Sequence, residues 1–202
     1  GGGKDNNQFI NPYGIAIGND GYIYAADSSN YCIKIFDSQG NFISKFGSYG
    51  TQDGQFTLPE DIAFDSDGNI YVVDGNRIQK FSSNFSFIKK WGSYGSGNGQ
   101  FKWPKSIAIS NDGYIFVVDS GNNRIQKFDL NGNYILQWGT FGSESGNFNY
   151  PTGITVDSNG YVYVVDQNNF RIQKFDFQGN FILSFGGYGS QNGKFFKPED
   201  IA

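Results

Sequence analysis

Five prolines recur at almost constant spacing along this 202-residue chain, and this regularity constrains the fold more than any other feature. They stand 47, 45, 47 and 47 residues apart, at Pro12, Pro59, Pro104, Pro151 and Pro198. A period between about 20 and 50 residues indicates a repeat architecture, in which one supersecondary unit is stacked several times. We therefore predict a single domain or domain fragment, 1–202, with repeats 12–58, 59–103, 104–150 and 151–197 and partial repeats 1–11 and 198–202.

The local pattern within each repeat predicts four short β-strands. In the second repeat, two β-rich runs, 62–64 and 70–73, flank a polar turn that contains Gly68, and glycine supplies the positive φ that a tight hairpin requires. A third run covers 78–81, and a fourth ends at Trp91. Tandem units of four antiparallel strands are typical of β-propeller blades. We therefore predict an all-β fold, a β-propeller of tandem four-stranded antiparallel blades, with about four blades in this chain.

The repeated motifs resemble those of the NHL-repeat propeller family. They are Pro-x-Gly-Ile-Ala-Ile, Asp-Gly-x-Ile-Tyr-Val-Val-Asp, Asn-Asn-Arg-Ile-Gln-Lys-Phe and Phe-Gly-Ser-x-Gly-Ser-x-x-Gly-x-Phe, and the likeness covers all four repeats. The resemblance implies roles in protein binding, ligand sensing or RNA binding. It also implies a ring that usually has six blades, so we expect a piece of a longer propeller, with a longer parent chain or a homo-oligomer completing the ring. Exposed strand edges would otherwise pair with another chain.

Residues that are identical between repeats are predicted to build the blade. The sets are the aspartates Asp27, Asp74, Asp119 and Asp166, and the arginines Arg77, Arg124 and Arg171, with Cys32 in the arginine position of the first repeat. A ring of carboxylates would suit acid-base chemistry or a cation, but an active site does not need one copy per blade. We interpret these residues as braces, in which each carboxylate accepts backbone N–H groups of its own loop and faces the following arginine.

Positions that differ between repeats are better candidates for binding. The loops between blades supply exposed aromatic residues, and the pairs that follow the prolines begin the innermost strands and change in character from repeat to repeat. The predicted ligand- or partner-binding face comprises Tyr13, Tyr49, Glu60, Asp61, Tyr94, Trp103, Lys105, Phe141, Tyr150 and Tyr188. Aromatic surfaces beside a few charges suit a polar ligand such as a carbohydrate, or a protein partner. The alternative is that the aromatic rings only pack between loops and the charges are solvated.

The absence of histidine excludes several kinds of chemistry for these residues. A Ser-His-Asp triad, a Cys-His dyad and a histidine-ligated zinc site all need it. The family resemblance suggests amidating lyases that hold zinc through histidines, but no position in this sequence can do so. We expect no metal and no cofactor, and we predict a non-catalytic binding or scaffold module.

Two alternatives remain open. The first is RNA binding through Tyr94, Lys102, Trp103 and Lys105, by base stacking and phosphate contact, although a net charge of -4 argues against nucleic acid as the partner. The second is a carboxylate-dependent enzyme that cleaves glycans, with Glu60, Asp61, Glu199 and Asp200 as its acids and bases.

The sequence says little about where the protein works. No apolar stretch reaches the roughly 18 residues that suggest a membrane span, so we expect no membrane insertion. Cys32 is the only cysteine, which excludes an intrachain disulfide and leaves the redox compartment open. The acidic, asparagine- and glycine-rich composition favours a secreted or cell-surface setting.

Overall fold

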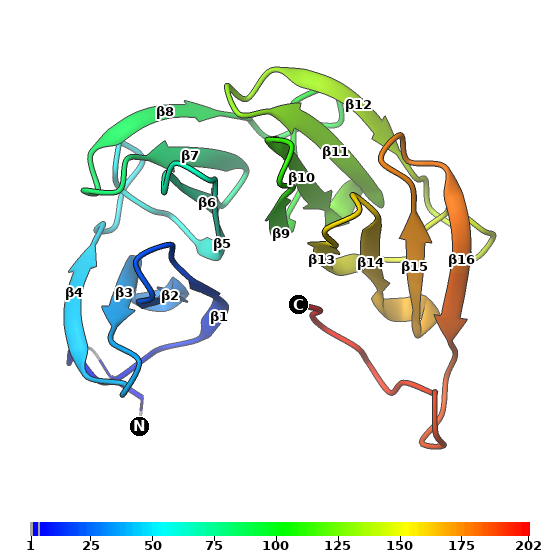
Figure 1. Cartoon of the computed structure of the whole chain (residues 1–202), viewed down its shortest axis with the longest axis horizontal. Helices are drawn as coiled ribbons and strands as arrows, with labels where there is room; N and C mark the ends of the chain where they lie inside the picture. Colours follow the sequence, from blue (N-terminus) through cyan, green and yellow to red (C-terminus); the bar gives the residue numbers. More distant parts are fainter. Residues whose placement is uncertain (1, 4) are drawn as a thin grey trace. The chain divides into compact units, whose positions relative to one another are not determined.

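The structure is a computed structural model that describes residues 2–3 and 5–202, and it is all-β. Four sheets, each of four antiparallel strands, follow one another along the chain, and we call them blades 1 to 4 (Figure 1). The chain divides into two compact units: the first ends at Gly92 and contains blades 1 and 2, and the second, Ser93–Ala202, contains blades 3 and 4. The predicted all-β propeller architecture of four-stranded antiparallel blades is confirmed.

The described residues of the first unit form eight strands and one short 3-10 helix. Blade 1 consists of β1 (Pro12–Ile17), β2 (Ile23–Asp27), β3 (Cys32–Phe36) and β4 (Phe42–Phe46), with the 3-10 helix η1 (Ser28–Asn30) between β2 and β3. Blade 2 consists of β5 (Pro59–Phe64), β6 (Ile70–Asp74), β7 (Arg77–Phe81) and β8 (Phe87–Trp91). Neighbouring strands in the sequence are neighbours in each sheet, which makes both blades simple meanders.

The second unit repeats this arrangement. Blade 3 consists of β9 (Pro104–Ile109), β10 (Tyr114–Asp119), β11 (Arg124–Asp129) and β12 (Tyr134–Trp138), with η2 (Ser120–Asn122) after β10. Blade 4 consists of β13 (Pro151–Val156), β14 (Val162–Asp166), β15 (Arg171–Phe175) and β16 (Phe181–Gly186), with η3 (Gln167–Asn169) after β14.

Every blade begins at one of the periodic prolines, as the spacing suggested. The full extent of the repeats, the single domain and the larger ring stay predictions. The partial repeat 1–11 includes Gly1 and Lys4, which lie outside the described residues.

The turn between the first two strands of blade 2 shows how the local sequence fixes a hairpin. Asp65 Oδ1 accepts the backbone N–H groups of Asp67 and Asn69 at 3.0 and 2.9 Å. Gly68 takes a φ of +78°, a left-handed conformation that glycine adopts without a steric penalty. The predicted interpretation of this segment as a turn therefore agrees with its geometry.

Each unit has its own hydrophobic core between its two blades. In the first unit the core includes Tyr24, Phe56, Ile62 and Phe81, with exposed fractions of 0 to 3 %. The equivalent cluster in the second unit includes Phe116, Phe148, Ile154 and Phe175. No helix among the described residues is long and apolar enough to cross a membrane.

Candidate functional site

The first strand of every blade is irregular immediately after its proline. In β5, Pro59 pairs with Asp74 whereas Asp61 pairs with Val73, so Glu60 is an extra residue in the ladder. β1, β9 and β13 contain a comparable register shift between the proline and the third residue after it. Such β-bulges re-aim side chains and are over-represented next to active sites. The residue pairs that vary between repeats therefore occupy bulges.

The bulge of β5 brings two carboxylates to the start of this strand. Glu60 is buried, with 4 % of its surface exposed, whereas Asp61 is partly exposed and its Oδ1 accepts the backbone N–H of Ile62 at 2.8 Å. A Cβ placed on Gly14 of β1 would lie 2.5 Å from Asp61 Cα and would overlap the Asp61 carboxylate. The missing side chain at Gly14 therefore lets Asp61 lie directly against β1, at the residue that follows Tyr13, which is 58 % exposed.

The second unit contains a related arrangement around β13. A Cβ on Gly153 would lie 2.7 Å from Asp200 Oδ1, so Asp200 lies against Gly153 as Asp61 lies against Gly14. Glu199, beside it, forms an exposed ion pair with Lys197 at 2.8 Å. In β9 of the same unit, Lys105 is partly buried and Ser106 is buried. The structure thus places an aspartate over a glycine in both units.

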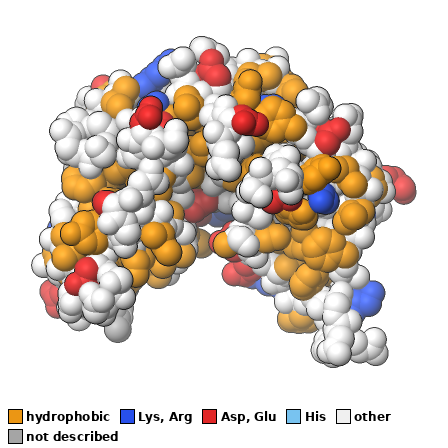
Figure 2. Space-filling view, viewed as in Figure 1, with side chains coloured by type: hydrophobic (Ala, Val, Ile, Leu, Met, Phe, Trp, Pro, Cys, Tyr) orange, Lys and Arg blue, Asp and Glu red, His pale blue; other side chains and the backbone are white. Residues whose placement is uncertain are grey.

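Figure 2 shows hydrophobic side chains on the visible surface of the molecule. The aromatic residues of the predicted binding face are mostly exposed. The exposed fractions are 70 % for Tyr49, 64 % for Tyr94, 57 % for Trp103, 71 % for Phe141 and 66 % for Tyr188, and Tyr150 is partly buried.

Some of these rings have aromatic neighbours from the loop between the second and third strands. The ring centroids of Tyr31 and Tyr49 are 4.7 Å apart, and those of Phe170 and Tyr188 are 4.9 Å apart. Trp103 and Tyr150 have φ angles of +51° and +55°, uncommon for bulky residues. These loops are therefore ordered by ring contacts and by constrained backbone, and the predicted use of the face for binding stays a prediction.

The repeated aspartates are the best-connected polar groups of the fold. Each of the four is fully buried. In blade 3, Asp119 Oδ2 accepts from Arg124 Nε at 2.7 Å, from Asn122 Nδ2 at 2.9 Å and from Gln126 Nε2 at 3.0 Å. A buried charge is tolerated when it is paired and hydrogen-bonded in this way. Asp74 and Asp166 bind Arg77 Nε and Arg171 Nε at 2.8 and 2.7 Å.

One detail of the brace interpretation is corrected by the geometry. The second carboxylate oxygen accepts backbone amides of the loop that precedes the first strand of the blade. Asp27 Oδ1 accepts from the amide of Ile10, and Asp119 Oδ1 from the amide of Lys102, each 17 residues earlier in the chain and each at 2.7 to 2.8 Å. The reason is topological: the loop that precedes the first strand ends beside the carboxyl end of the second strand, so its amides are the nearest unpaired donors.

Blade 1 has no arginine in this network, and a second substitution compensates for its loss. Cys32 occupies the position of Arg77, while Lys34 occupies the position of Gln79. Lys34 Nζ lies 2.9 Å from Asp27 Oδ2, and both side chains are buried. The positive charge missing at Cys32 is thus supplied two residues later, and this explains why the cysteine is tolerated. The aligned repeats show lysine at position 34 where the others have glutamine, and this difference is the sequence signal that could have revealed the compensating charge.

Among residues 2–3 and 5–202, no group of three or more histidine, cysteine or acidic side chains could hold a metal ion. Sequence comparison identifies the repeat: the NHL repeat model matches residues 101–128 and 148–175. The chain contains NHL repeats. A search of curated proteins finds no match.

Solved structures similar to the chain include a streptogramin B lyase, with 20 % identity over 86 % of this chain and 54 % of that protein, at a TM-score of 0.66. A second is a catalytically inactive histidine variant of virginiamycin B lyase from Staphylococcus aureus, with quinupristin; it shares 17 % identity over 94 % of this chain and 58 % of that one, at a TM-score of 0.69. A third is a gluconolactonase from Xanthomonas campestris, with 15 % identity over 94 % and 64 % and a TM-score of 0.68. This chain thus spans between 54 and 64 % of the length of these structures.

These comparisons correct the functional prediction. The expectation of a non-catalytic binding or scaffold module is wrong, because similar propellers are enzymes, two lyases and a gluconolactonase. The identities, 15 to 20 %, carry the fold alone and do not transfer any of these activities. The lack of histidine excludes histidine-dependent chemistry, but it does not exclude catalysis by other side chains, so the prediction of a non-catalytic module went too far. The enzymatic alternative is the one that the comparisons favour.

Proposed function

We propose that this chain carries carboxylates of a hydrolase that opens a sugar-derived lactone. The observation that supports it is the β5 bulge, which places a buried carboxylate, Glu60, next to a partly exposed one, Asp61, and packs Asp61 against Gly14, the residue that follows Tyr13. A carboxylate positioned by a bulge suits general-base catalysis. The gluconolactonase among the similar structures supports the choice of substrate class.

The proposed chemistry needs one base and one hydrogen-bond donor. Asp61 takes a proton from a water molecule as the water oxygen attacks the lactone carbonyl carbon. The Tyr13 hydroxyl donates a hydrogen bond to the developing oxyanion. The ring C–O bond then breaks, and the alkoxide recovers the proton from Asp61, which yields a hydroxy acid.

The same geometry makes glycoside cleavage the weaker choice. Glycosidases need two carboxyl groups that flank the scissile bond from opposite sides, about 5 to 9.5 Å apart. Glu60 and Asp61 are consecutive residues at the start of one strand, and the second acidic pair, Glu199 and Asp200, belongs to the other compact unit. A single base with a donor is sufficient for the opening of a lactone, so the arrangement in the first unit fits acyl hydrolysis better.

The test measures gluconolactone hydrolysis by the full chain in a pH-indicator assay, with the spontaneous rate in buffer subtracted. We expect D61N to lower kcat/KM about 100-fold or more, the usual contribution of a general base. Y13F is expected to lower kcat more than it changes KM, because its hydrogen bond forms only in the transition state.

The matched control is D53N. Asp53 is an exposed carboxylate of the same unit, paired with Lys90 at 2.7 Å, and the proposed reaction does not use it. Hydrolysis no faster than in buffer, or D61N as active as D53N, would overturn the proposal. An aryl glycoside assayed in parallel distinguishes lactone opening from glycoside cleavage. If the chain cleaved the glycoside, D61N abolished that cleavage and no lactone were opened, the glycosidase function would replace the lactonase function.

A further inference from the structure

A pocket in the first unit lies at the opposite end of β5 from the carboxylate pair. It has a volume of about 330 Å³ and opens beside the turns between β1 and β2 and between β5 and β6. Tyr24 and Phe64 form its aromatic floor, with ring centroids 4.8 Å apart, and Asp20, Asp67 and Ser83 lie at its rim. This volume is within the range of about 300 to 1,000 Å³ typical of small-molecule sites.

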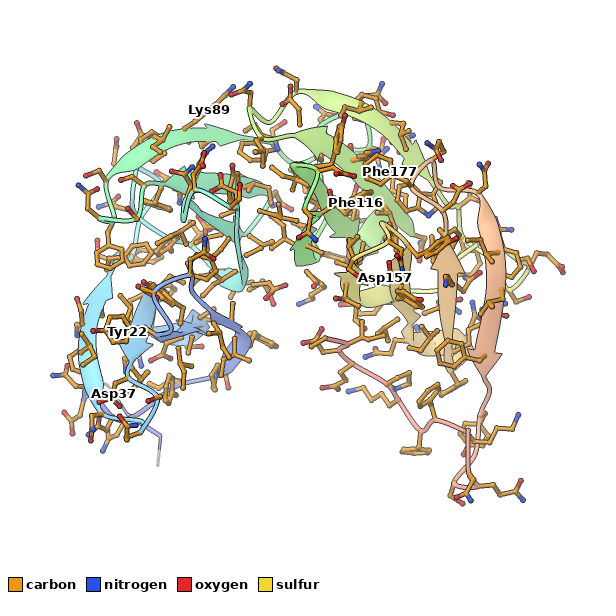
Figure 3. All side chains as sticks on the ribbon, in the orientation of Figure 1. Tyr22, Asp37, Lys89, Phe116, Asp157 and Phe177 are labelled. Atoms are coloured by element: carbon orange, nitrogen blue, oxygen red, sulfur yellow. The ribbon has the colours of Figure 1, made fainter. Side chains whose placement is uncertain are left out.

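The equivalent place in the second unit is filled by a side chain. Phe177 occupies there the position that Ser83 has in blade 2, two residues after the last phenylalanine of the third strand. Its ring centroid is 5.9 Å from Phe116 and 5.0 Å from Tyr114, and Figure 3 shows Phe116 and Phe177 beside each other. Lys127 Nζ lies 3.2 Å from the centre of the Phe177 ring. An aromatic ring next to an ammonium group thus fills this space.

The open space in the first unit follows from a set of coupled substitutions. Blade 2 has a phenylalanine, Phe85, two residues after Ser83, and this ring stacks on Phe46 at 4.9 Å with an interplanar angle of 10°. The corresponding residues of the second unit are Gly179 and Trp138, where a Cβ on the glycine would lie 2.7 Å from the indole. Phe46 is smaller than Trp138 and therefore leaves room for the Phe85 ring. Ser83 is smaller than Phe177 and therefore leaves the pocket open.

The charged residues at the rim of the pocket determine which ligand charge it favours. Asp20 Oδ2 accepts the Tyr24 hydroxyl at 2.7 Å and Asp20 Oδ1 accepts the Tyr22 amide at 3.0 Å, so this carboxylate is held over the aromatic floor. Asp67 is exposed at the facing turn. None of the described residues that line the pocket is a lysine or an arginine. Carboxylates beside aromatic rings favour a cation, through ion pairing and cation–π attraction.

We propose that this pocket binds a small molecule that carries both an aromatic ring and a protonated amine, the arylalkylamine class. The ring takes the place that Phe177 fills in the second unit, on Tyr24 and Phe64. The ammonium group lies between Asp20 and Asp67. Because Asp61 is at the start of β5 and Phe64 is at its end, this site is separate from the carboxylate pair and does not depend on the proposed hydrolysis.

The experiment titrates the full chain with phenylethylamine, followed by ligand-observed NMR and isothermal titration calorimetry. S83F places a ring where the second unit has one, and we expect it to weaken binding at least tenfold while the chain stays folded by circular dichroism. D67N is expected to weaken binding several-fold. D37N is the control, since Asp37 lies in the β3–β4 turn and does not line the pocket.

Two comparisons make the outcome decisive. Phenylacetate has the same ring and the opposite charge, so binding as tight as that of phenylethylamine would overturn the role of the carboxylates. S83F with wild-type affinity would overturn the site itself. S83F is expected to leave gluconolactone hydrolysis unchanged, which separates the failure of this inference from the failure of the proposed function.

Discussion

Replacing Lys34 by glutamine tests whether blade 1 keeps its fold through the compensating charge. The Lys34–Asp27 pair is 2.9 Å long and almost completely buried. K34Q introduces the residue that the other three blades have at this position, but it leaves Cys32 where they have arginine. The carboxylate of Asp27 would then be buried without a cation.

The contacts of Lys34 determine how much unfolding free energy K34Q should lose. Removing one partner of a buried ion pair costs about 3–5 kcal/mol, because the remaining charge stays desolvated. The new glutamine recovers part of this, as Gln79 donates to Asp74 Oδ2 at 3.2 Å and to the carbonyl of Gln55 at 2.7 Å. A hydrogen bond to a charged group contributes about 1.5–3 kcal/mol, so from the middle of each range we expect a net loss of about 2 kcal/mol.

The assay is equilibrium unfolding in urea, followed by circular dichroism, together with hydrogen exchange of residues 5–36. Exchange gives a local signal, because the amide of Ile10 donates to Asp27 Oδ1 at 2.8 Å and should lose protection first. The double variant C32R/K34Q recreates the network of the other blades and should recover most of the loss. K45Q, at an exposed position of β4, is the control and should change stability by less than about 0.5 kcal/mol.

Two results would refute this reasoning. If K34Q unfolded at the same urea concentration as the wild type, the buried carboxylate would not need a cation. If C32R/K34Q were no more stable than K34Q, the arginine and lysine positions would not be exchangeable.

Three further predictions concern single side chains. Burial lowers the pKa of Lys127 to about 8, so its charged form destabilises the folded state below that pH. Because the unfolded chain holds this proton up to about pH 10.5, the unfolding free energy should rise between about pH 8 and 10.5 by about 1–3 kcal/mol. The same rise in K127M would contradict this. G14A should lower lactone hydrolysis at least tenfold and destabilise the chain by about 1–3 kcal/mol, since its methyl group would overlap backbone atoms of Glu60 and Asp61 and displace Asp61; unchanged kcat/KM would count against the site. G179A should destabilise by about 1–3 kcal/mol in thermal unfolding, because Trp138 and a φ of +84° both oppose a side chain, and a smaller loss in W138F/G179A than in G179A would identify the indole as the cause.

The blade architecture was predictable because its determinants are local and repeated. Each of the first four prolines marks the start of a first strand, and the aspartate 15 residues later marks the end of the second, so the spacing alone predicts where Pro104 and Asp119 lie. The pairing of Asp119 with Arg124 follows from the same repetition. These features are specified by residue type at fixed offsets, which a comparison of repeats detects directly.

The bulges, the amide partners of the aspartates and the pocket depend on strand pairing and on side-chain volume, which cannot be read from the spacing of residues along the sequence. The bulge at Glu60 leaves the proline spacing unchanged, because every blade has its own, and only strand register reveals it. The amide partners of the aspartates lie 17 residues upstream, where sequence proximity does not point. The pocket arises from the difference between Ser83 and Phe177, whose meaning depends on the rings at Phe46 and Trp138.

The bulges separate two tasks within each first strand. Beyond the bulge, the strand is held by regular pairing, as Ile62 with Val72 and Ala63 with Tyr71 show in blade 2. At the bulge, an extra residue interrupts the regular ladder, so new side chains can be tried there without shifting the strands that follow. The pairs at the four bulges are therefore a compact set of positions for directed evolution, in which specificity can be randomised while the buried aspartate network is left untouched.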